Sequence, residues 1–213
     1  MNEYMKKHYD VLGPRVVSSL VKRGFDAYYV NDCQEALSMA LELIKPTDTV
    51  GYGGSLTINQ VGIKEALRKR ENVIFERDNA TNEEERKAYE RQALGADWFL
   101  MSSNGISEDG QLVNVDGFGN RVASLIYGPK NVLVICGMNK ICPTVEDACK
   151  RARKLAAPAN LMRFPGKTCP CVITGSCTDC IANDCGCNTV VISRRSNPAG
   201  RIKIILVGDE LGL

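Results

Sequence analysis

Short apolar runs alternate along the chain with longer segments in which apolar residues recur every three or four positions. The runs are rich in β-branched, aromatic or aliphatic residues and predict strands at 25–30, 49–52, 73–75, 98–102, 132–136 and 202–207. The longer segments predict helices at 4–23, 33–44, 57–70, 81–95 and 144–157. Such alternation predicts an α/β fold built on an open, largely parallel sheet with helices on both faces.

Residues that start or stop helices mark several boundaries. Pro14 lies inside the first helical segment, so a break or kink is expected beside it. Thr81 stands three residues before Glu84, which is the spacing of a capping box at the start of a helix. Thr144 is expected to cap the last long helix, and Pro158 to end it.

Two segments do not follow the alternation. Turn residues at 107–110 precede the apolar run 111–115, so a hairpin-like excursion is expected there. A further strand is predicted at 189–193, after a cysteine-rich segment at 167–188. No repeat, low-complexity stretch or flexible linker interrupts the chain, so residues 1–213 are expected to form one domain that includes this segment.

Composition and charge exclude several classes of function. Apolar residues make up 44% of the 213 residues and charged residues 24%, as in an ordinary globular protein. The net charge of +2 gives no extended field for nucleic acid or for an anionic membrane. No apolar run approaches the roughly 18 residues of a membrane span, and no signal-peptide core opens the chain. A cytoplasmic protein with reduced thiols is expected; whether it forms a homo-oligomer is left open.

The glycine-rich stretch G-Y-G-G-S-L-T at 51–57 joins a predicted strand to a predicted helix. Gly53 and Gly54 would let backbone N–H groups approach a ligand closely, and Ser55 and Thr57 would add hydroxyl donors. This combination suits a phosphate or a carboxylate. The alternative is a plain tight turn in which Ser55 or Thr57 caps the helix.

Polar residues and glycines are interleaved between 104 and 121. Asn114, Asp116 and Asn120 would follow strand ends, where open α/β sheets often form a ligand crevice. Asp116 is the best single candidate for an acid/base or ligand-positioning carboxylate, with the two asparagines as ligand-binding residues. The alternative is a pair of ordinary turns with side chain to backbone hydrogen bonds.

Six of the ten cysteines lie between 167 and 188. They are Cys169, Cys171, Cys177, Cys180, Cys185 and Cys187. Cys177 and Cys180 form a chelating C-x-x-C unit, and Cys171 and Cys187 flank it, so four thiolates are available to one metal site. Four sulfurs suit an iron–sulfur cluster of the 4Fe-4S type or a tetrahedral zinc ion, and the spacing does not separate the two.

The two remaining thiols of this segment, Cys169 and Cys185, are surplus to a four-thiolate site. They would be spare ligands or reactive thiols, and the sequence leaves their roles open. The alternatives to a metal site are disulfides, which a reducing compartment disfavours, and free thiols. The single histidine, His8, excludes a multi-histidine metal site within one chain.

Four stretches together resemble one known family. They are V-G-Y-G-G-S-L-T-I at 50–58 and the segments 95–121, 126–141 and 156–160, and the family is that of LUD-domain, or lactate-utilization, proteins. The run C-V-I-T-G-S-C-T-D-C at 171–180 also resembles the tail of the shorter family members. Cys169 and Cys185 depart from that tail pattern.

The resemblance implies a fold similar to the NagB/RpiA/CoA-transferase group. In that group a glycine-rich loop with Ser or Thr holds a phosphate, which corresponds here to Gly53, Gly54, Ser55 and Thr57. It also implies a link to the oxidation of lactate to pyruvate, where a LUD subunit works with iron–sulfur partner proteins. Analogy of fold does not determine the reaction.

These observations predict a redox-associated protein of lactate or 2-hydroxy-acid utilization. It would bind an anionic small molecule at the glycine-rich loop and an iron–sulfur cluster at the C-terminal cysteines. One alternative is an isomerase- or transferase-like enzyme for a sugar phosphate or an acyl-CoA, with Asp116 as acid/base and structural zinc on the cysteines. Another is a non-catalytic assembly subunit, or one that senses metal or redox state.

Overall fold

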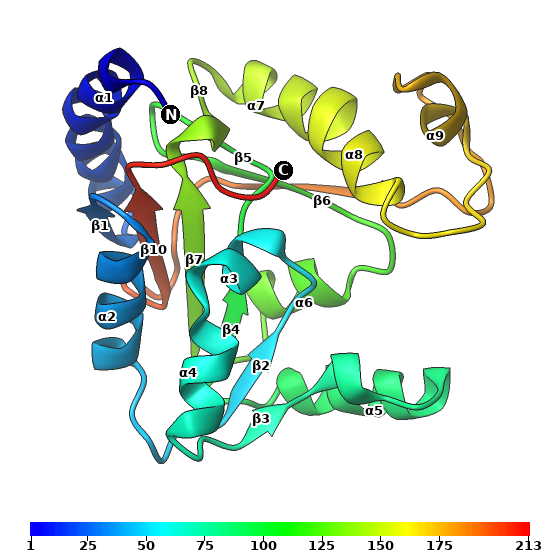
Figure 1. Ribbon diagram of the computed structural model, residues 1–213, viewed down its shortest axis with the longest axis horizontal. Helices are drawn as coiled ribbons and strands as arrows, with labels where there is room; N and C mark the ends of the chain where they lie inside the picture. Colours follow the sequence, from blue (N-terminus) through cyan, green and yellow to red (C-terminus); the bar gives the residue numbers. More distant parts are fainter.

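Six parallel strands form the larger of two sheets, in the order β1-β10-β7-β4-β2-β3 (Figure 1). The computed structural model describes residues 1–213. Every neighbouring pair of strands is parallel. The strands are β1 (Asp26–Val30), β2 (Val50–Tyr52), β3 (Ile74–Phe75), β4 (Trp98–Met101), β7 (Asn131–Gly137) and β10 (Ile202–Val207). The predicted open parallel sheet is confirmed.

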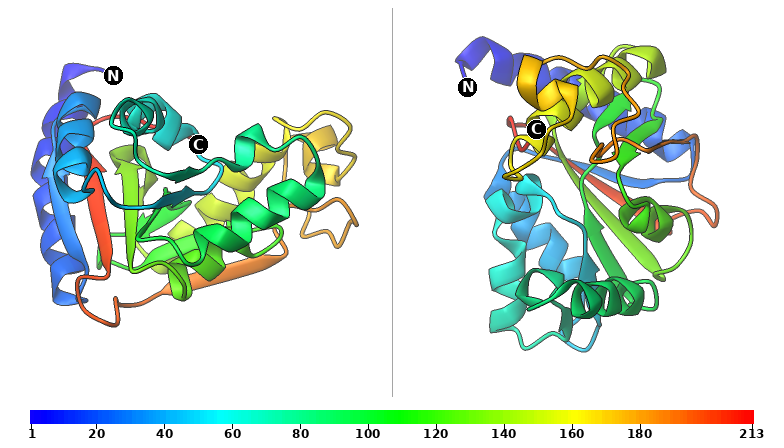
Figure 2. Two further views of the ribbon diagram at one scale, coloured as in Figure 1. Left: turned by 90° about the horizontal axis from the view of Figure 1, so that it is seen from below. Right: turned by 90° about the vertical axis from the view of Figure 1, so that its right-hand side faces the viewer.

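Helices cover both faces of this sheet (Figure 1, Figure 2). Side chains alternate between the faces, so Phe99 and Met101 of β4 join one buried cluster and Trp98 and Leu100 join the other. The helices of the first cluster are α1 (Glu3–Lys22), α5 (Glu83–Ala93) and α6 (Asn120–Ile126). Those of the second are α2 (Cys33–Leu43), α3 (Leu56–Val61) and α4 (Ile63–Lys69).

A second sheet of four strands has the order β8-β5-β6-β9. Its strands are β5 (Gly105–Ser107), β6 (Leu112–Asp116), β8 (Ile141–Cys142) and β9 (Thr189–Ser193). Strands β5 and β6 are antiparallel, which confirms the predicted hairpin. Strand β9 pairs with β6, far from it in the sequence. This sheet was not predicted, because no local pattern indicates which distant strand completes it.

The first helix differs from its prediction. Helix α1 runs unbroken through Pro14, so the expected break is absent. A proline removes one helical hydrogen bond, whereas the helix packs against β1 and buries Tyr9, Leu12, Val16 and Leu20. Gly13 allows this close approach, since a Cβ atom there would lie 2.2 Å from Cδ2 of Tyr29. Packing on the sheet thus outweighs the local cost of the proline.

Two other long helices are subdivided. The segment predicted as one helix at 57–70 is split into α3 and α4 by Gly62, which has φ of 75°. Pro158 was expected to end the helix that Thr144 caps, and this is wrong. Helix α7 (Val145–Arg151) continues through a wider turn at Ala152–Ala156 into α8 (Ala157–Leu161), which contains Pro158. The wider turn precedes the proline, whose nitrogen cannot donate the usual helical bond.

Short elements and one cap complete the fold. The cap of α5 is Asn82 rather than Thr81: its Oδ1 accepts from Glu85 N at 2.8 Å, while Thr81 N donates to the Glu85 carboxylate. The short elements are the 3₁₀ turns Arg77–Asn79 and Met138–Lys140 and helix α9 (Pro170–Thr174). None of the helices has the length and apolar character required to cross a membrane.

Candidate functional site

The carboxyl ends of β2, β4 and β7 meet at one edge of the larger sheet, because these strands are parallel neighbours. Thr57 lies beyond the end of β2, Ser102 follows β4 directly, and Lys140 follows β7. A cleft of about 430 Å³ opens above them. Ligand sites of open α/β sheets lie at this edge. The sequence-based prediction of a crevice at strand ends agrees with this placement.

Lys140 lies on the floor of the cleft and is only 3% exposed. Its Nζ donates hydrogen bonds to Thr57 Oγ1 and Ser102 Oγ, both at 3.0 Å, and forms no ion pair with a carboxylate. Burial lowers the pKa of Lys140, and the positive charges of Arg151 and Arg121 lower it further. A buried ammonium that has only hydroxyl partners is an attractive neighbour for an anion.

Cationic side chains outnumber carboxylates around the cleft. The seven cations are Lys64, Arg77, Arg86, Arg121, Lys140, Arg163 and Lys167, and the three carboxylates are Asp78, Glu90 and Asp116. Lys64 pairs with Asp78 and Arg77 with Glu90, each at 2.8 Å. Lys140 is one of three lining cations without an ion pair; Arg163 and Lys167 are the others. The cleft therefore carries an excess of positive charge.

The glycine-rich loop contributes to the cleft unevenly. Gly54, Ser55 and Thr57 line it, whereas Gly53 lies behind it. The Gly53 N–H donates to the Leu100 carbonyl at 3.0 Å and is thus already bonded. Ser55 caps α3 by accepting from Ile58 N at 3.4 Å. Ser55 therefore acts as the helix cap that the alternative interpretation expected. Thr57 instead accepts a hydrogen bond from Lys140.

Arg121 ties the loops behind the cleft together. Its guanidinium donates to Asn114 Oδ1 at 2.7 Å, Asn104 Oδ1 at 3.0 Å, and the carbonyls of Ser102 at 3.1 Å and Val115 at 2.6 Å. These partners come from the ends of β4 and β6. One half-buried cation therefore holds the edge of the larger sheet against the second sheet.

Because Gly53 has no side chain, the aliphatic part of the Arg121 side chain can pack against its backbone. A Cβ atom on Gly53 would lie 2.9 Å from Arg121 Cδ. This glycine, predicted to bring the backbone close to an anion, instead brings it close to an arginine side chain.

Asp116 lines the cleft, but its oxygens already have partners. Oδ1 accepts from the N–H groups of Phe118 at 3.3 Å and Gly119 at 3.1 Å, and Oδ2 accepts from Val122 N at 3.3 Å. Arg121 Nε lies 3.6 Å from Oδ2. The carboxylate thus organises the turn that leads into α6. Its role in acid/base chemistry stays a prediction.

The two predicted asparagines are separated by the structure. Asn120 is the first residue of α6 and lines the cleft. Asn114 is fully buried behind the cleft, where its Oδ1 accepts from Arg121 and its Nδ2 has no partner. Asn120 can therefore reach a ligand directly, whereas Asn114 can act only through Arg121.

The cysteine-rich segment borders the cleft. Lys167 and Gly186 of this segment are among the lining residues. The Lys167 Nζ donates to the Asp184 carbonyl at 2.9 Å, and the Asn188 Nδ2 donates to the Gly117 carbonyl at 3.0 Å. In Figure 1 the segment follows α8 and carries α9 on the side of the molecule away from α1. The thiol-rich segment and the cleft are direct neighbours.

The thiols of this segment form two close pairs. The sulfurs of Cys169 and Cys171 are buried beside Leu161 and lie 3.8 Å apart. Those of Cys185 and Cys187 lie 3.0 Å apart. Burial and the Cys185 thiol raise the pKa of Cys187 to about 12. The pairing brings together one predicted ligand and one surplus cysteine in each case.

The chemistry of these donors suits a thiolate metal site, while their present arrangement does not complete one. No three side chains of His, Cys, Asp or Glu are placed to hold a metal ion. The separation of Cys169 and Cys171 matches the edge of a tetrahedral zinc–thiolate site, about 3.8 Å for Zn–S bonds of roughly 2.3 Å. Ligation by Cys171, Cys177, Cys180 and Cys187 stays a prediction.

The profile of the LUD domain matches residues 14–207, which is most of the chain. The chain belongs to the LUD-domain family. The resemblance seen in the sequence is thereby confirmed, and the family is associated with lactate utilization.

This LUD domain is also similar in fold to a solved structure, that of a DUF162 family protein from Deinococcus radiodurans. The two share 12% identity with a TM-score of 0.53, over 93% of this chain and 98% of the other. At that identity the likeness concerns the fold alone. No curated protein matches the chain.

Sequence reasoning missed the cations of this LUD domain that have no ion pair. Lys140 follows the apolar strand at 132–136 within a few residues, and its place near a strand end was the available signal. Arg163 and Lys167 lie in an irregular segment after α8 and carry no such signal. That they line the same cleft as Lys140 depends on how the second sheet and α8 pack beside the larger sheet.

Proposed function

We propose that this LUD domain binds an anionic small molecule in the cleft, within the redox metabolism of lactate or related 2-hydroxy acids. The observation that carries the proposal is Lys140, a buried ammonium whose only hydrogen-bond partners are the hydroxyls of Thr57 and Ser102. A carboxylate or phosphate beside Lys140 Nζ would supply the missing countercharge. Charge-assisted hydrogen bonds of this kind are stronger than neutral ones.

The neighbouring side chains would position that acid group. Thr57 and Ser102 accept from the ammonium and hold it at the cleft floor. The Thr57 hydroxyl keeps its own proton, which can be donated to a ligand oxygen, whereas the Ser102 hydroxyl donates to the Ser103 carbonyl at 3.5 Å. Asn120, on the cleft wall, could hydrogen-bond a hydroxyl or carbonyl oxygen next to the acid group.

We further infer that the cysteine-rich segment holds a metal centre through Cys171, Cys177, Cys180 and Cys187. An iron–sulfur cluster bound there would supply one-electron transfer, whereas zinc would only fix the loop. The neighbourhood of Gly186 and the cleft supports a redox role, because a cluster on this segment would lie next to the bound anion. Iron–sulfur partner subunits would then exchange electrons with it.

Anaerobic purification followed by iron, acid-labile sulfide and zinc analysis tests the metal centre. We expect iron and sulfide, a visible absorption shoulder, and loss of both in a Cys177→Ser/Cys180→Ser variant. The Cys33→Ser variant is the control, because Cys33 lies at the start of α2 outside the segment. Protein without iron, sulfide or zinc would contradict the metal proposal. The anion site is tested separately, by calorimetric titration with small acids.

The excess of cations around the cleft also favours a second function, an isomerase- or transferase-like enzyme for a phosphorylated substrate. Asp116 would then be the acid/base. Its three backbone hydrogen bonds argue for a structural role instead. Turnover of a sugar phosphate or acyl-CoA that survives Cys177→Ser/Cys180→Ser and is lost in Asp116→Asn would favour this alternative. Specific complex formation without any turnover would favour a non-catalytic assembly or sensing subunit.

A further inference from the structure

The cleft is much larger than a three-carbon acid. Its volume of about 430 Å³ falls in the range of sites that enclose drug-sized ligands, roughly 300–1,000 Å³. A water molecule occupies about 30 Å³, so an acid of lactate's size on Lys140 would leave most of the space filled with water. The natural occupant is therefore expected to extend beyond the floor.

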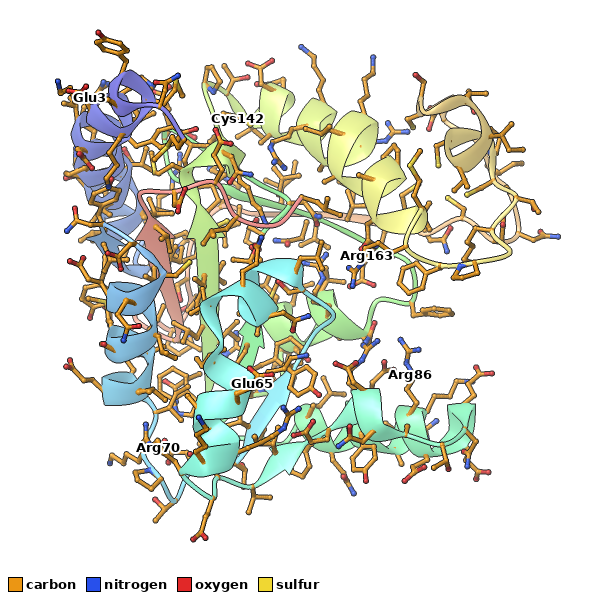
Figure 3. The ribbon with its side chains drawn as sticks, viewed as in Figure 1. Glu3, Glu65, Arg70, Arg86, Cys142 and Arg163 are labelled. Atoms are coloured by element: carbon orange, nitrogen blue, oxygen red, sulfur yellow. The ribbon has the colours of Figure 1, made fainter.

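Two further lining cations come from the segment after α8, whereas Lys140 comes from the turn that follows β7. Arg163 donates from its guanidinium to Asn160 Oδ1 at 2.9 Å, and Lys167 donates to the Asp184 carbonyl at 2.9 Å. Both line the cleft, and neither forms an ion pair with a carboxylate. Figure 3 shows Arg163 after α8 and Arg86 on α5 extending into the gap between these two helices. Arg86 pairs with Glu90 at 3.5 Å, so Arg163 and Lys167 are the two cations here that remain available to an anion.

Two aromatic side chains also line the cleft. Phe118 is 92% exposed and Phe164 is 44% exposed, and they come from the loop before α6 and the segment after α8. Large apolar side chains left open to water on a cleft wall often mark a ligand-contacting surface. They provide apolar contact for a carbon skeleton.

We propose that the occupant is a two-ended anion, a phosphorylated carboxylic acid whose carboxylate binds at Lys140 and whose phosphate binds at Arg163 and Lys167. This rests on the proposed anion site and names its ligand class. The fork of Arg163 matches the oxygens of a phosphate, and the two cations together balance its charge. A free three-carbon acid would occupy only the inner end and bind more weakly.

Calorimetry with two matched pairs of probes tests the proposal: glycerate against 3-phosphoglycerate, and gluconate against 6-phosphogluconate. In each pair only the phosphate differs, and the two pairs differ in length. We expect at least one phosphorylated acid to bind ten-fold or more tightly than its partner. A gain below three-fold in both pairs would overturn the two-ended ligand.

The Arg163→Gln/Lys167→Gln variant locates the phosphate. It should abolish the gain from the phosphate while leaving the affinity for the unphosphorylated acid within two-fold of the wild type. The control is Lys154→Gln/Arg195→Gln, which removes one lysine and one arginine that are exposed and lie outside the cleft. If the variant weakens both members of a pair equally, the assignment of the outer end is wrong.

Thermal unfolding of each variant separates a lost contact from a lost fold. Should the double variant unfold early, Arg163→Gln alone is used, since it leaves the cysteine-rich segment unchanged. Binding of glycerate without a gain from the phosphate overturns only the two-ended ligand. Failure of all four probes to bind overturns the proposed anion site as well.

Discussion

Lys140 Nζ lies 3.0 Å from Thr57 Oγ1, although 83 residues separate the two in the sequence. Thr57 follows β2, Lys140 follows β7, and β4 lies between these strands in the sheet. Ser102, at the end of β4, completes the contact. The order of the parallel strands therefore creates the floor of the cleft.

Replacing Lys140 by Met should weaken anion binding. The substitution keeps the length of the side chain and removes its charge, so the loss corresponds to one charge-assisted hydrogen bond, about 1.5–3 kcal/mol, or about ten-fold or more in affinity. Calorimetry with the tightest-binding acid measures it. Lys150→Met on the exposed face of α7 is the matched control and should bind like the wild type. Equal binding by Lys140→Met would place the anion elsewhere.

The same variant should change how stability depends on pH. Burial lowers the pKa of Lys140 in the folded chain, whereas an unfolded lysine has a pKa of about 10.4. Between these two values the unfolded chain binds more protons, so this lysine makes the free energy of unfolding rise with pH. The stability of the wild type relative to Lys140→Met should therefore increase as pH rises through that window.

Urea unfolding at several pH values from 7 to 10.5 measures this difference. Lys150→Met again serves as the control, because Lys150 is exposed and does not line the cleft. A difference between wild type and Lys140→Met that stays constant over the range would show that Lys140 has an ordinary pKa.

Arg121→Gln should destabilise the fold strongly. It leaves the oxygens of Asn104 and Asn114 and two carbonyls without their donor, and it leaves Asp116 without its cation. Breaking a buried charge pair costs about 3–5 kcal/mol. Arg195→Gln, on the exposed turn before β10, should cost within about 0.5 kcal/mol. Urea unfolding compares them, and similar values would argue against a structural role for Arg121.

Gly110→Ala and Gly200→Ala form a matched pair. Both glycines have positive φ, 90° and 74°, so each substitution carries a conformational cost of about 1–2 kcal/mol. At Gly110 the added Cβ would also lie 2.8 Å from the backbone carbon of Ser19 in α1, whereas at Gly200 it meets open space. We expect Gly110→Ala to be the more destabilising by about 2 kcal/mol or more in urea unfolding. Equal losses would mean that α1 moves freely.

Asp116→Asn should reduce stability by about 1–3 kcal/mol. The amide keeps one acceptor oxygen and places an NH₂ group against N–H donors of the turn into α6. Urea unfolding measures the loss. If stability is unchanged while an activity disappears, the aspartate has the chemical role that its position in the sequence suggested.

The sheet and the family could be predicted from sequence because both depend on local patterns. Alternating apolar runs and helical segments record which positions are buried, and they predicted all six strands of the larger sheet. The prediction at Pro14 failed, because the gain from packing α1 on β1 is not visible in the helix's own residues. The hairpin of β5 and β6 was predictable from its turn, whereas its extension by β9 was not.

The sequence by itself determined the parallel α/β architecture, the placement of Thr57 near a strand end, and the thiol-rich segment at 167–188. Only the tertiary structure decided that Gly53 accommodates Arg121, that the thiols pair as they do, and that Lys140 has no carboxylate partner. The reason is physical. The periodicity of apolar residues shows which face of one helix or strand is buried, whereas the partners of a charged side chain depend on which distant strand ends become neighbours in the sheet.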